Sequence, residues 1–444
     1  MSRNVLIITL GCAKNTCDSE NMAFLLKEAG FKIVDSSDKA DYVIVNTCGF
    51  IEAAKTESVG VIFDAVKIKK ERPGVKLIVT GCLSQRYADE IAEGIPEADY
   101  ILGAMDIYDI ADILSGQKEP TAGRHIYRTD NDAPLVETGR QRLDDAPYAY
   151  IKIAEGCDRR CTYCAIPLIR GKQRSRRIED ICSEAEAVVS AGAKELVIVA
   201  QDTGEYGTDN YGRRMIVPLI RRLASIEGLR QLRLMYVYPE AVDEELIDAY
   251  RTEGKLVKYI DIPFQHVSSH ILKRMGRGAT RETVRGCVEA LRQAVPGIAI
   301  RSTFMTGFPG ETEEDVDELI EFLKEYKLTR AGVFVYSREE GTAAADFPDQ
   351  IEEDVKQARY ERVMEAQRDI SASVMESFIG TTLSVLVEEE PDEPGGYYSG
   401  LSYLDAPEVD GEVYFTSEKT LNAGDYADVT ITDSTEYDLW GQSK

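Results

Sequence analysis

The chain has 444 residues, of which 43% are hydrophobic and 29% charged, with a net charge of −26 and nine cysteines. This length predicts two or three domains, and no apolar run approaches the roughly 20 residues that span a bilayer. We therefore expect a soluble, cytoplasmic protein that makes no membrane contact. The negative charge opposes long-range attraction to nucleic acid. In a reducing compartment, nine cysteines indicate metal or redox chemistry rather than a disulfide framework.

The first 117 residues alternate strand-like and helix-like segments. Apolar runs precede amphipathic stretches at 5–10, 40–47 and 75–81. In the first amphipathic stretch, 18–30, Asp18 or Ser19 is a candidate helix cap and Gly30 a candidate end. This alternation predicts a parallel α/β sheet. The opening MSRNVLIITLGC has the outline of a lipoprotein signal ending at Cys12, but its apolar stretch of about seven residues is too short.

The rest of the chain divides into three parts. Residues 118–146 are polar and weakly periodic, which is typical of a linker or a surface excursion. From 147 to 377, six strand–helix units predict a complete or partial (β/α) barrel, closed by one long helix at 349–378. Residues 378–444 contain short strands and turns, typical of a small antiparallel, OB-like β-barrel. This last domain has 15 acidic residues and two lysines, and so carries half of the net charge.

The segment EGCDRRCTYC, residues 155–164, spaces three cysteines as C-x3-C-x2-C at the end of the first barrel strand. The thiolates of Cys157, Cys161 and Cys164 can hold three irons of a [4Fe–4S] cluster. The fourth iron then stays open, as a catalytic metal requires. The alternatives are a zinc knuckle, for which a fourth ligand is missing nearby, and three unrelated cysteines.

This motif, with an aromatic residue before its last cysteine, resembles the radical S-adenosylmethionine (SAM) enzymes. The resemblance implies that the open iron chelates SAM, and that one electron then cleaves SAM to a deoxyadenosyl radical, which abstracts hydrogen from the substrate. The protein orients and shields this chemistry. The resemblance also implies that the cofactor is held by Tyr163, Gln201, Asp202, Gln265, Arg301 and Thr303. For each residue taken alone, a loop-stabilising role is an equal alternative.

Three further cysteines stand where predicted strands end. Cys12, Cys48 and Cys82 follow LIITLG, VIVNT and LIVTG, at separations of 36 and 34 residues, which fit one βαβ unit each. Parallel strands would bring them to one carboxyl edge, where α/β proteins place their ligands. We expect a second [4Fe–4S] cluster with three ligands and an open iron; the alternative is three buried thiols.

Two such clusters in this order resemble the radical SAM methylthiotransferases, which insert an S–CH3 group into a C–H bond. The motifs LGCAKNTCDSE, NTCGF, TGC and EGCDRRCTYCAIPLIRGKQRSR match that family. The resemblance covers essentially the whole chain, and it identifies the last 67 residues as a TRAM domain. Cys17 departs from the family pattern and is interpreted as a bystander, with a redox-sensitive thiol as the alternative. Cys182 and Cys287 fall in helical patterns and are expected in the core.

The family acts on adenosine in transfer RNA or on an aspartate of small-subunit ribosomal protein twelve. An acidic TRAM domain without arginine gains no counterion-release energy on RNA, whereas it complements a basic ribosomal protein. The motif IDIPFQH also resembles the ribosomal-protein branch. We therefore expect methylthiolation of the aspartate β-carbon, with two SAM molecules and an external electron donor. A transfer-RNA methylthiotransferase is the alternative, and a two-cluster electron carrier is a third hypothesis. The basic run 170–177 is either a solvated face or a contact to an acidic group.

Overall fold

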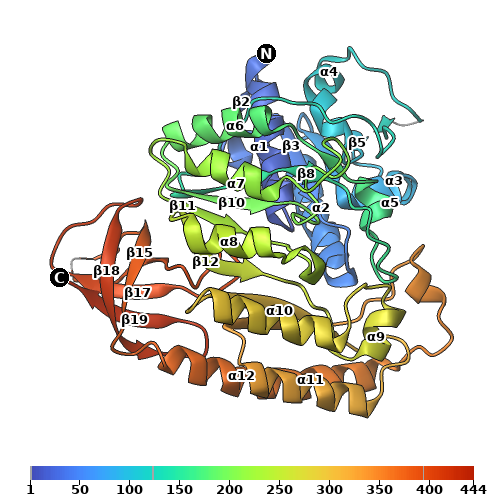
Figure 1. The fold of residues 1–444 in the computed structure, drawn as a ribbon. Coiled ribbons are helices and arrows are strands. Elements are labelled where there is room, and N and C mark those ends of the chain that lie inside the picture. The colour runs from blue at the N-terminus through green and yellow to red at the C-terminus, as the bar shows by residue number, and fades with distance from the viewer. Residues whose placement is uncertain (1–2, 123–124, 394) are drawn as a thin grey trace.

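The computed structural model describes residues 3–122, 125–393 and 395–444. Within these ranges the chain forms three units, coloured blue to cyan, green to orange and red in Figure 1. No helix in the described ranges is long and apolar enough to cross a membrane. The predicted architecture, an α/β sheet followed by a partial barrel and a small β-barrel, is confirmed.

The N-terminal unit is a parallel sheet of six strands in the order β2-β1-β3-β4-β5-β6. The strands are β1 Asn4–Thr9, β2 Lys32–Ile33, β3 Tyr42–Thr47, β4 Lys76–Gly81, β5 Tyr100–Leu102 and β6 Ile126–Tyr127. The helices are α1 Ala13–Glu28, α2 Glu52–Glu71, α3 Cys82–Gly94 and α4 Ile110–Ser115. The centre of the sheet is fully apolar because helices cover both faces, as a parallel sheet requires.

Helix α1 begins earlier than its sequence predicted. Cys12, in an extended conformation, occupies the N-cap position, whereas Asp18 and Ser19 are buried inside the helix. The prediction of either residue as the cap is therefore wrong. Gly11, at φ +94°, lets the chain pass from strand to helix within a few residues. The predicted end of the helix is confirmed, because Gly30 at φ +84° completes a Schellman motif.

The segment 118–146 is attached to the folded units rather than free. It supplies strand β6 to the N-terminal sheet. Farther along, the Arg140 guanidinium forms ion pairs with Glu20 of α1 and, at 3.0 Å, with Glu184 of the next unit. The segment therefore connects the N-terminal and central units through specific contacts. Its polar, weakly periodic sequence did not predict these contacts.

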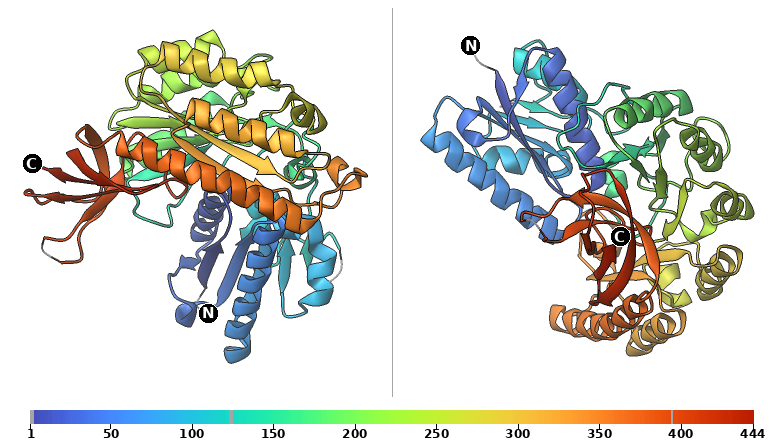
Figure 2. Two further views of the ribbon diagram at one scale, coloured as in Figure 1. Left: turned by 90° about the horizontal axis from the view of Figure 1, so that it is seen from below. Right: turned by 90° about the vertical axis from the view of Figure 1, so that its left-hand side faces the viewer.

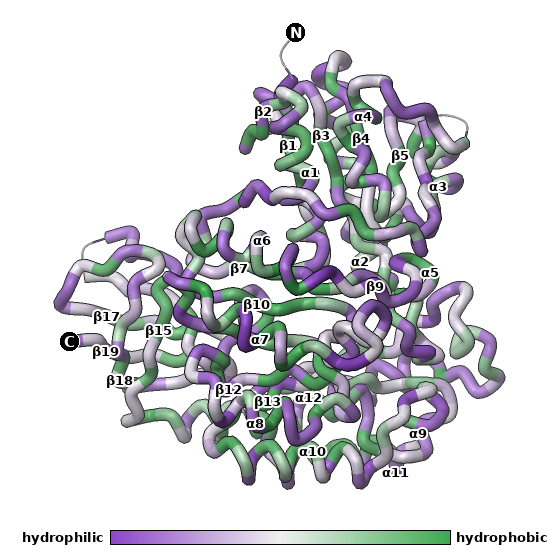
Figure 3. Tube along the Cα trace, turned by 45° about the horizontal axis from the view of Figure 1, so that its top comes forward, coloured by the Kyte–Doolittle hydropathy of each residue, from purple (hydrophilic) through white to green (hydrophobic). Residues whose placement is uncertain are grey.

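The central unit is a partial barrel of six parallel strands in the order β14-β13-β12-β11-β10-β7. The strands are β7 Tyr148–Lys152, β10 Glu195–Val199, β11 Gln231–Leu234, β12 Leu256–Asp261, β13 Ala299–Thr306 and β14 Arg330–Val335, with a small ribbon of β8 Ala154–Glu155 and β9 Arg174–Ser175. The helices are α5 Ile166–Arg170, α6 Ile178–Ser190, α7 Ile216–Ala224, α8 Glu244–Thr252, α9 Ser269–Arg274, α10 Arg281–Ala294, α11 Glu313–Tyr326 and α12 Glu353–Glu376. Most of these helices form an outer arc around the strands (Figure 2), and the strands are the hydrophobic part of the trace (Figure 3).

The C-terminal unit is a closed barrel in the order β15-β16-β17-β19-β18. Its strands are β15 Thr382–Glu389, β16 Tyr398–Leu401, β17 Val413–Ser417, β18 Tyr426–Ser434 and β19 Leu439–Ser443. The barrel was expected to be antiparallel, and all pairs are except β17 with β19, which run parallel. That pair closes the barrel, and closure removes the exposed edges of the sheet.

The two outer units attach to opposite ends of the central strands. The loop 402–410 of the C-terminal unit enters the amino-terminal side, where Asp405 pairs with Arg330 and Asp410 accepts a hydrogen bond from the Tyr259 hydroxyl at 2.6 Å. The N-terminal unit covers the carboxyl side instead. There Asp18 pairs with Lys152, the last residue of β7. The carboxyl ends, where barrel enzymes place their chemistry, therefore face the N-terminal unit.

Candidate functional site

The three cysteines of the N-terminal unit, here the N-terminal triad, lie at one carboxyl edge. Cys12 caps α1 after β1, Cys48 follows β3, and Cys82 opens α3 after β4. These three strands are neighbours in the sheet. A Cβ atom added at Gly11 would lie 2.7 Å from the Cβ and 3.1 Å from the Sγ of Cys48. A glycine is thus required where the first cysteine turns toward the second.

Two asparagines that sequence reasoning did not single out hold this edge together. The Asn15 side chain donates to the carbonyl oxygens of Leu10 at 2.8 Å and Thr47 at 3.1 Å. Asn46 donates in turn to the carbonyl oxygen of Asn15 at 3.0 Å. Both side chains are fully buried. For Asn46, a polar residue at the end of the apolar strand run VIVNT was the available signal, whereas Asn15 lies in a polar stretch of α1 that carries no such signal.

Burial and mutual proximity change the chemistry of the N-terminal triad. Burial raises the pKa of Cys48 to about 11, helped by the nearby thiols of Cys82 and Cys12. Burial also raises the pKa of Cys82, against the opposing effect of Arg170. Such thiols stay neutral without a metal, whereas an iron ion displaces their protons on binding. The donor set therefore fits a cluster.

The second group, here the barrel triad, lies on the loop after β8. Burial raises the pKa of both Cys157 and Cys164 to about 12. The loop between the cysteines is anchored by Thr162, whose N–H and hydroxyl both donate, at 2.9 Å, to carbonyl oxygens at the end of α9. Cys161 is packed among the apolar side chains of the barrel mouth. The anchored loop thus carries three cysteines, of which Cys157 and Cys161 are buried and Cys164 is half-buried.

Residues around the barrel triad add contacts to its sulfur atoms. The Arg159 N–H donates to the Cys157 Sγ at 3.4 Å, and the Tyr238 hydroxyl lies 3.8 Å from the Cys161 Sγ. The Arg277 guanidinium lies 4.3 Å from the centre of the Tyr238 ring. Sequence reasoning missed all three neighbours: Arg159 lies within the cysteine motif itself, whereas Tyr238 and Arg277 come from loops with no recognisable motif. Hydrogen bonds to ligating sulfurs are the means by which proteins tune such clusters.

The alternative of a single zinc ion receives no support from the geometry. Among the described residues, no three His, Cys, Asp or Glu side chains surround a common point for an ion. Zinc would need its thiolates at about 2.3 Å. In a [4Fe–4S] cluster each thiolate binds a different iron, so the thiolates stand farther apart.

Two of the residues expected to hold SAM end in buried, unsatisfied oxygen atoms. The Oε1 atoms of Gln201 and Gln265 have no hydrogen-bond partner within the described residues. Gln201 donates through its nitrogen to Glu155 at 3.0 Å. Gln265 adopts φ +71° and its N–H donates to the carbonyl oxygen of Thr303 at 2.8 Å. Unpaired buried acceptors are costly, and a bound ligand with donor groups would satisfy them.

The other expected SAM contacts have varied surroundings. Asp202 accepts from Arg159 at 2.8 Å, and burial raises its pKa. Tyr163 is buried and accepts from Arg277 at 3.4 Å. Thr303 is half-buried on β13. Arg301 is engaged elsewhere, in ion pairs to barrel and C-terminal carboxylates at 2.8 and 3.2 Å.

The basic run 170–177 is neither a solvated face nor a free contact surface. Arg170 is 2% exposed and pairs with Asp18 at 2.7 Å. Arg176 pairs with Glu184 at 2.7 Å, and its side chain is 10% exposed. Lys172 and Arg177 are the exposed basic residues of this run. Both sequence interpretations are therefore wrong for the buried arginines, because their carboxylate partners lie in distant segments.

Three family models match the chain. Residues 4–103 match an uncharacterized protein family, UPF0004, residues 151–323 match the radical SAM superfamily, and residues 379–443 match the TRAM domain. The chain is also 46% identical to "Ribosomal protein uS12 methylthiotransferase RimO" from Thermoanaerobacter sp. (strain X514), covering 99% of this chain and 100% of that protein. The protein of the same name from Desulforamulus reducens is 47% identical, covering 98% of each chain.

Solved structures share the fold at low sequence identity. The radical SAM methyltransferase TsrM from Kitasatospora setae superposes with a TM-score of 0.57 at 17% identity, over 90% of this chain and 81% of that one. The cobalamin-dependent SAM radical enzyme OxsB gives a TM-score of 0.55 at 14% identity, over 82% of this chain and 56% of that one. Cys157, Cys161 and Cys164 lie within the region that matches the radical SAM model.

Proposed function

The chain belongs to the RimO family of ribosomal protein uS12 methylthiotransferases, and we propose that it attaches a methylthio group to the β-carbon of an aspartate of uS12. It is a radical SAM enzyme. The observation that carries the proposal is the pair of cysteine triads, buried or half-buried, one in each of the two matched units. A two-cluster electron carrier is disfavoured, because pure electron carriers usually ligate all four irons.

Membership of the radical SAM superfamily implies one [4Fe–4S] cluster and SAM. We assign this cluster to Cys157, Cys161 and Cys164, and a second one to Cys12, Cys48 and Cys82. When bound, these groups supply the electron, the reactive sulfonium, the methyl group and the sulfur for transfer. A one-electron donor and a cytoplasmic location belong to the same proposal.

The chain's own residues bind and shield these groups. Gln201 and Gln265 offer acceptors to the amino and hydroxyl groups of SAM through their unsatisfied oxygen atoms. We also assign Asp202, Tyr163 and Thr303 to the SAM site at the barrel mouth. For Arg301, whose guanidinium is already paired, the contact to SAM is the least supported of the set. The covering N-terminal unit excludes water, which protects a reactive intermediate.

Charge favours uS12 over transfer RNA. The C-terminal unit has no arginine and a net charge of −13. Several of its acidic side chains are exposed around one turn, among them Glu389, Glu390, Asp392 and Glu393. Such a surface attracts a basic ribosomal protein and repels RNA phosphates.

The test is a direct competition between substrates. Anaerobically reconstituted protein, SAM and a reductant are incubated with purified uS12, with small ribosomal subunits and with transfer RNA, and each product is examined by mass spectrometry. We expect a methylthio increment on one aspartate of uS12. An increment on transfer RNA alone would overturn the assignment.

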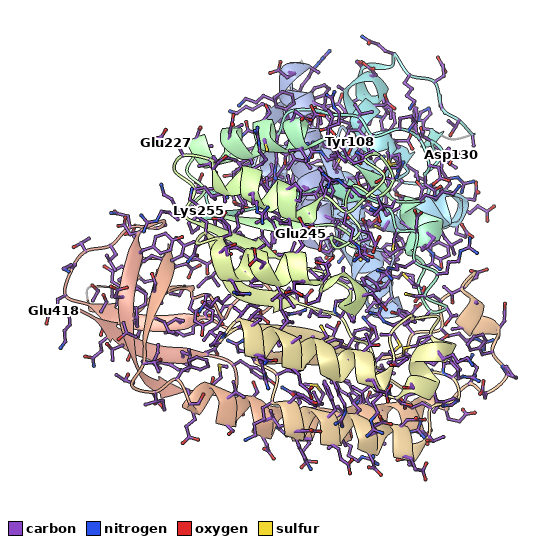
Figure 4. All side chains as sticks on the ribbon, in the orientation of Figure 1. Tyr108, Asp130, Glu227, Glu245, Lys255 and Glu418 are labelled. Atoms are coloured by element: carbon purple, nitrogen blue, oxygen red, sulfur yellow. The ribbon has the colours of Figure 1, made fainter. Side chains whose placement is uncertain are left out.

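A charge variant tests how uS12 is attracted. The variant E389Q/E390Q/D392N/E393Q should raise KM for uS12 several-fold at low salt and leave kcat unchanged. The matched control is E227Q/E245Q, at two exposed positions on the barrel helices side (Figure 4), which should leave KM unchanged. Equal effects of both variants would show that overall charge, rather than the C-terminal surface, is responsible.

A further inference from the structure

A short helix separates the two triads. Helix α5 begins two residues after Cys164, at Ile166, and ends at Arg170. Its inner side is apolar: Ala165 and Ile169 pack with Cys82 as a small, separate buried cluster. One end of α5 is thus continuous with the barrel triad, and its side contacts the N-terminal triad.

The Arg170 side chain extends this contact to the sulfur itself. Its guanidinium donates to the Cys82 Sγ at 3.3 Å and to the Asn15 Oδ1 at 2.8 Å. Its other terminal nitrogen donates to Asp18 at 2.7 Å and to Glu155 at 3.2 Å. All of these side chains are at least nine-tenths buried. Both terminal nitrogens of the guanidinium group are therefore fixed by hydrogen bonds in a buried environment, where such hydrogen bonds are strong.

The next residue contacts the other triad. The carbonyl oxygen of Gly171 accepts the N–H of Cys157 at 3.1 Å. Gly171 has φ +71° and ψ −158°, a conformation open essentially to glycine alone. Residues 170 and 171 therefore touch a cysteine of each triad, one through the side chain and one through the backbone.

The buried charges around Arg170 are balanced. Lys152 pairs with Asp18 and, at 2.8 Å, with Glu155, so two basic and two acidic groups share the network. The arginine thus retains a full positive charge beside Cys82 without leaving a net buried charge. Removal of Arg170 alone would strand a carboxylate, which costs about 3–5 kcal/mol in comparable buried pairs.

We propose that Arg170 is a positioning residue for the second cluster: it fixes Cys82 through a charge-assisted hydrogen bond and makes that cluster easier to reduce. This inference rests on the proposed second cluster. Reduction adds negative charge to the cluster and its thiolates, and a donor with positive charge stabilises that form. Together with Gly171, Arg170 also holds a cysteine of each triad, Cys82 and Cys157, against adjacent residues of the chain.

The experiment isolates the second cluster in the variant C157A/C161A/C164A, which should retain about four irons per chain. In this background, D18N is compared with D18N/R170Q, a pair in which the double change keeps the buried network neutral. Redox titration followed by absorption and electron paramagnetic resonance gives the midpoint potential. We expect D18N/R170Q to lower the potential by about 59 mV, a tenfold shift of a one-electron reduction equilibrium. D18N/R170K, which keeps a charged donor, should shift it less.

Each outcome has a defined meaning. Four irons and an unchanged potential in D18N/R170Q would overturn the role of Arg170 and leave the second cluster intact. Loss of iron from D18N/R170Q with recovery in D18N/R170K, in chains of native circular dichroism, supports the role. Loss of iron from both would overturn it, since the charge and the hydrogen bond would then be insufficient. Absence of iron from the background variant itself would refute the second cluster and, with it, the proposed function.

Discussion

The barrel triad and the N-terminal triad each contain three cysteines, but the two triads are assembled in opposite ways. The barrel triad lies within residues 157–164, on one loop. The N-terminal triad spans residues 12–82 and meets only because β1, β3 and β4 pair in register. A local triad depends on the conformation of one loop, whereas a distributed triad depends on the whole sheet. Damage to the fold should therefore affect them unequally.

Both triads share one backbone feature. A glycine at positive φ directly precedes a cysteine at Gly11 (φ +94°), Gly81 (φ +99°) and Gly156 (φ +76°). At Gly156 an added Cβ would lie 2.1 Å from the carbonyl oxygen of Lys172. Each glycine lets the chain bend sharply so that the thiol projects past the strand end.

The largest difference between the two triads should appear when one cysteine is removed from each in turn. C161A should abolish SAM cleavage and methylthiolation together, because the proposed assignment places the radical-generating cluster on the barrel triad. C48A should abolish methylthiolation and leave SAM cleavage in place. Each variant should lose about four of about eight irons. The measurements are iron content, release of deoxyadenosine and mass spectrometry of uS12.

C182A is the matched control, because Cys182 is a small core residue of α6. It should retain all irons and both activities, at a cost of about 1 kcal/mol of stability. Loss of SAM cleavage in C48A would show that the two triads do not act separately.

Substitution of the glycine before Cys82 tests whether the N-terminal triad depends on its backbone conformation. G81A places a Cβ 2.5 Å from the carbonyl oxygen of Thr47, at φ +99° and ψ −153°. Strain and overlap together should destabilise the N-terminal unit by about 3 kcal/mol and remove its irons first. Chemical unfolding and iron content measure both effects.

G30A is the control for G81A, since Gly30 also has positive φ but open space around its Cβ. It should cost about 1 kcal/mol without loss of iron. Equal iron loss in both variants would contradict the idea that the strand-end glycine is specific to the triad.

A substitution at the amino-terminal end of the barrel should leave both triads intact. Asp410 accepts hydrogen bonds from Tyr259 at 2.6 Å and Arg301 at 3.2 Å. D410A should destabilise the attachment of the C-terminal unit by about 2 kcal/mol, because Arg301 keeps its pair with Asp261. Limited proteolysis near residue 378 and thermal unfolding report this loss. Iron content and SAM cleavage by the intact chain should stay unchanged; a fall in SAM affinity would instead support a cofactor role for Arg301.

A pH dependence is expected at the same end. Burial, with the nearby carboxylates of Glu412 and Glu195, raises the pKa of Glu388 to about 8. In the unfolded chain its pKa is the ordinary 4.5, so the folded state holds an extra proton between these values. Stability should therefore fall as pH rises from 5 to 8 and stay lower above. E388Q should be more stable than the natural chain at pH 9 and equal to it at pH 5, as measured by urea unfolding.

E418Q is the control, because Glu418 is exposed at the outer end of the C-terminal unit (Figure 4). Its unfolding midpoint should follow the natural chain at both pH values. An identical pH profile for E388Q and E418Q would show that Glu388 does not titrate in this range.

The sequence predicted the parts whose signal is periodic or local. The six barrel strands, the long helix and the three units follow from apolar runs and their spacing. Cys157, Cys161 and Cys164 are recognisable because their ligand spacing lies within one loop. The edge formed by Cys12, Cys48 and Cys82 could be inferred because parallel strands share a direction.

What could not be predicted depends on pairing between distant segments. Arg170 has the appearance of a surface residue, since charged side chains are rarely buried. Its burial follows from Asp18 and Glu155, which meet it only in the folded chain. The start of α1 was missed because Asp18 and Ser19 are better capping residues than Cys12. Here the strand-end turn at Gly11 decides where the helix begins.

The attachment of the outer units to opposite ends of the central strands sets a requirement on the shape of the partner. Strand β12 has six residues, so about 20 Å of barrel separates the two ends. A protein that rests on the acidic C-terminal unit must therefore reach about this far to place a side chain beside the cysteines. The modified residue should lie on a projecting loop or arm of its protein, so that reach, as well as charge, selects the substrate.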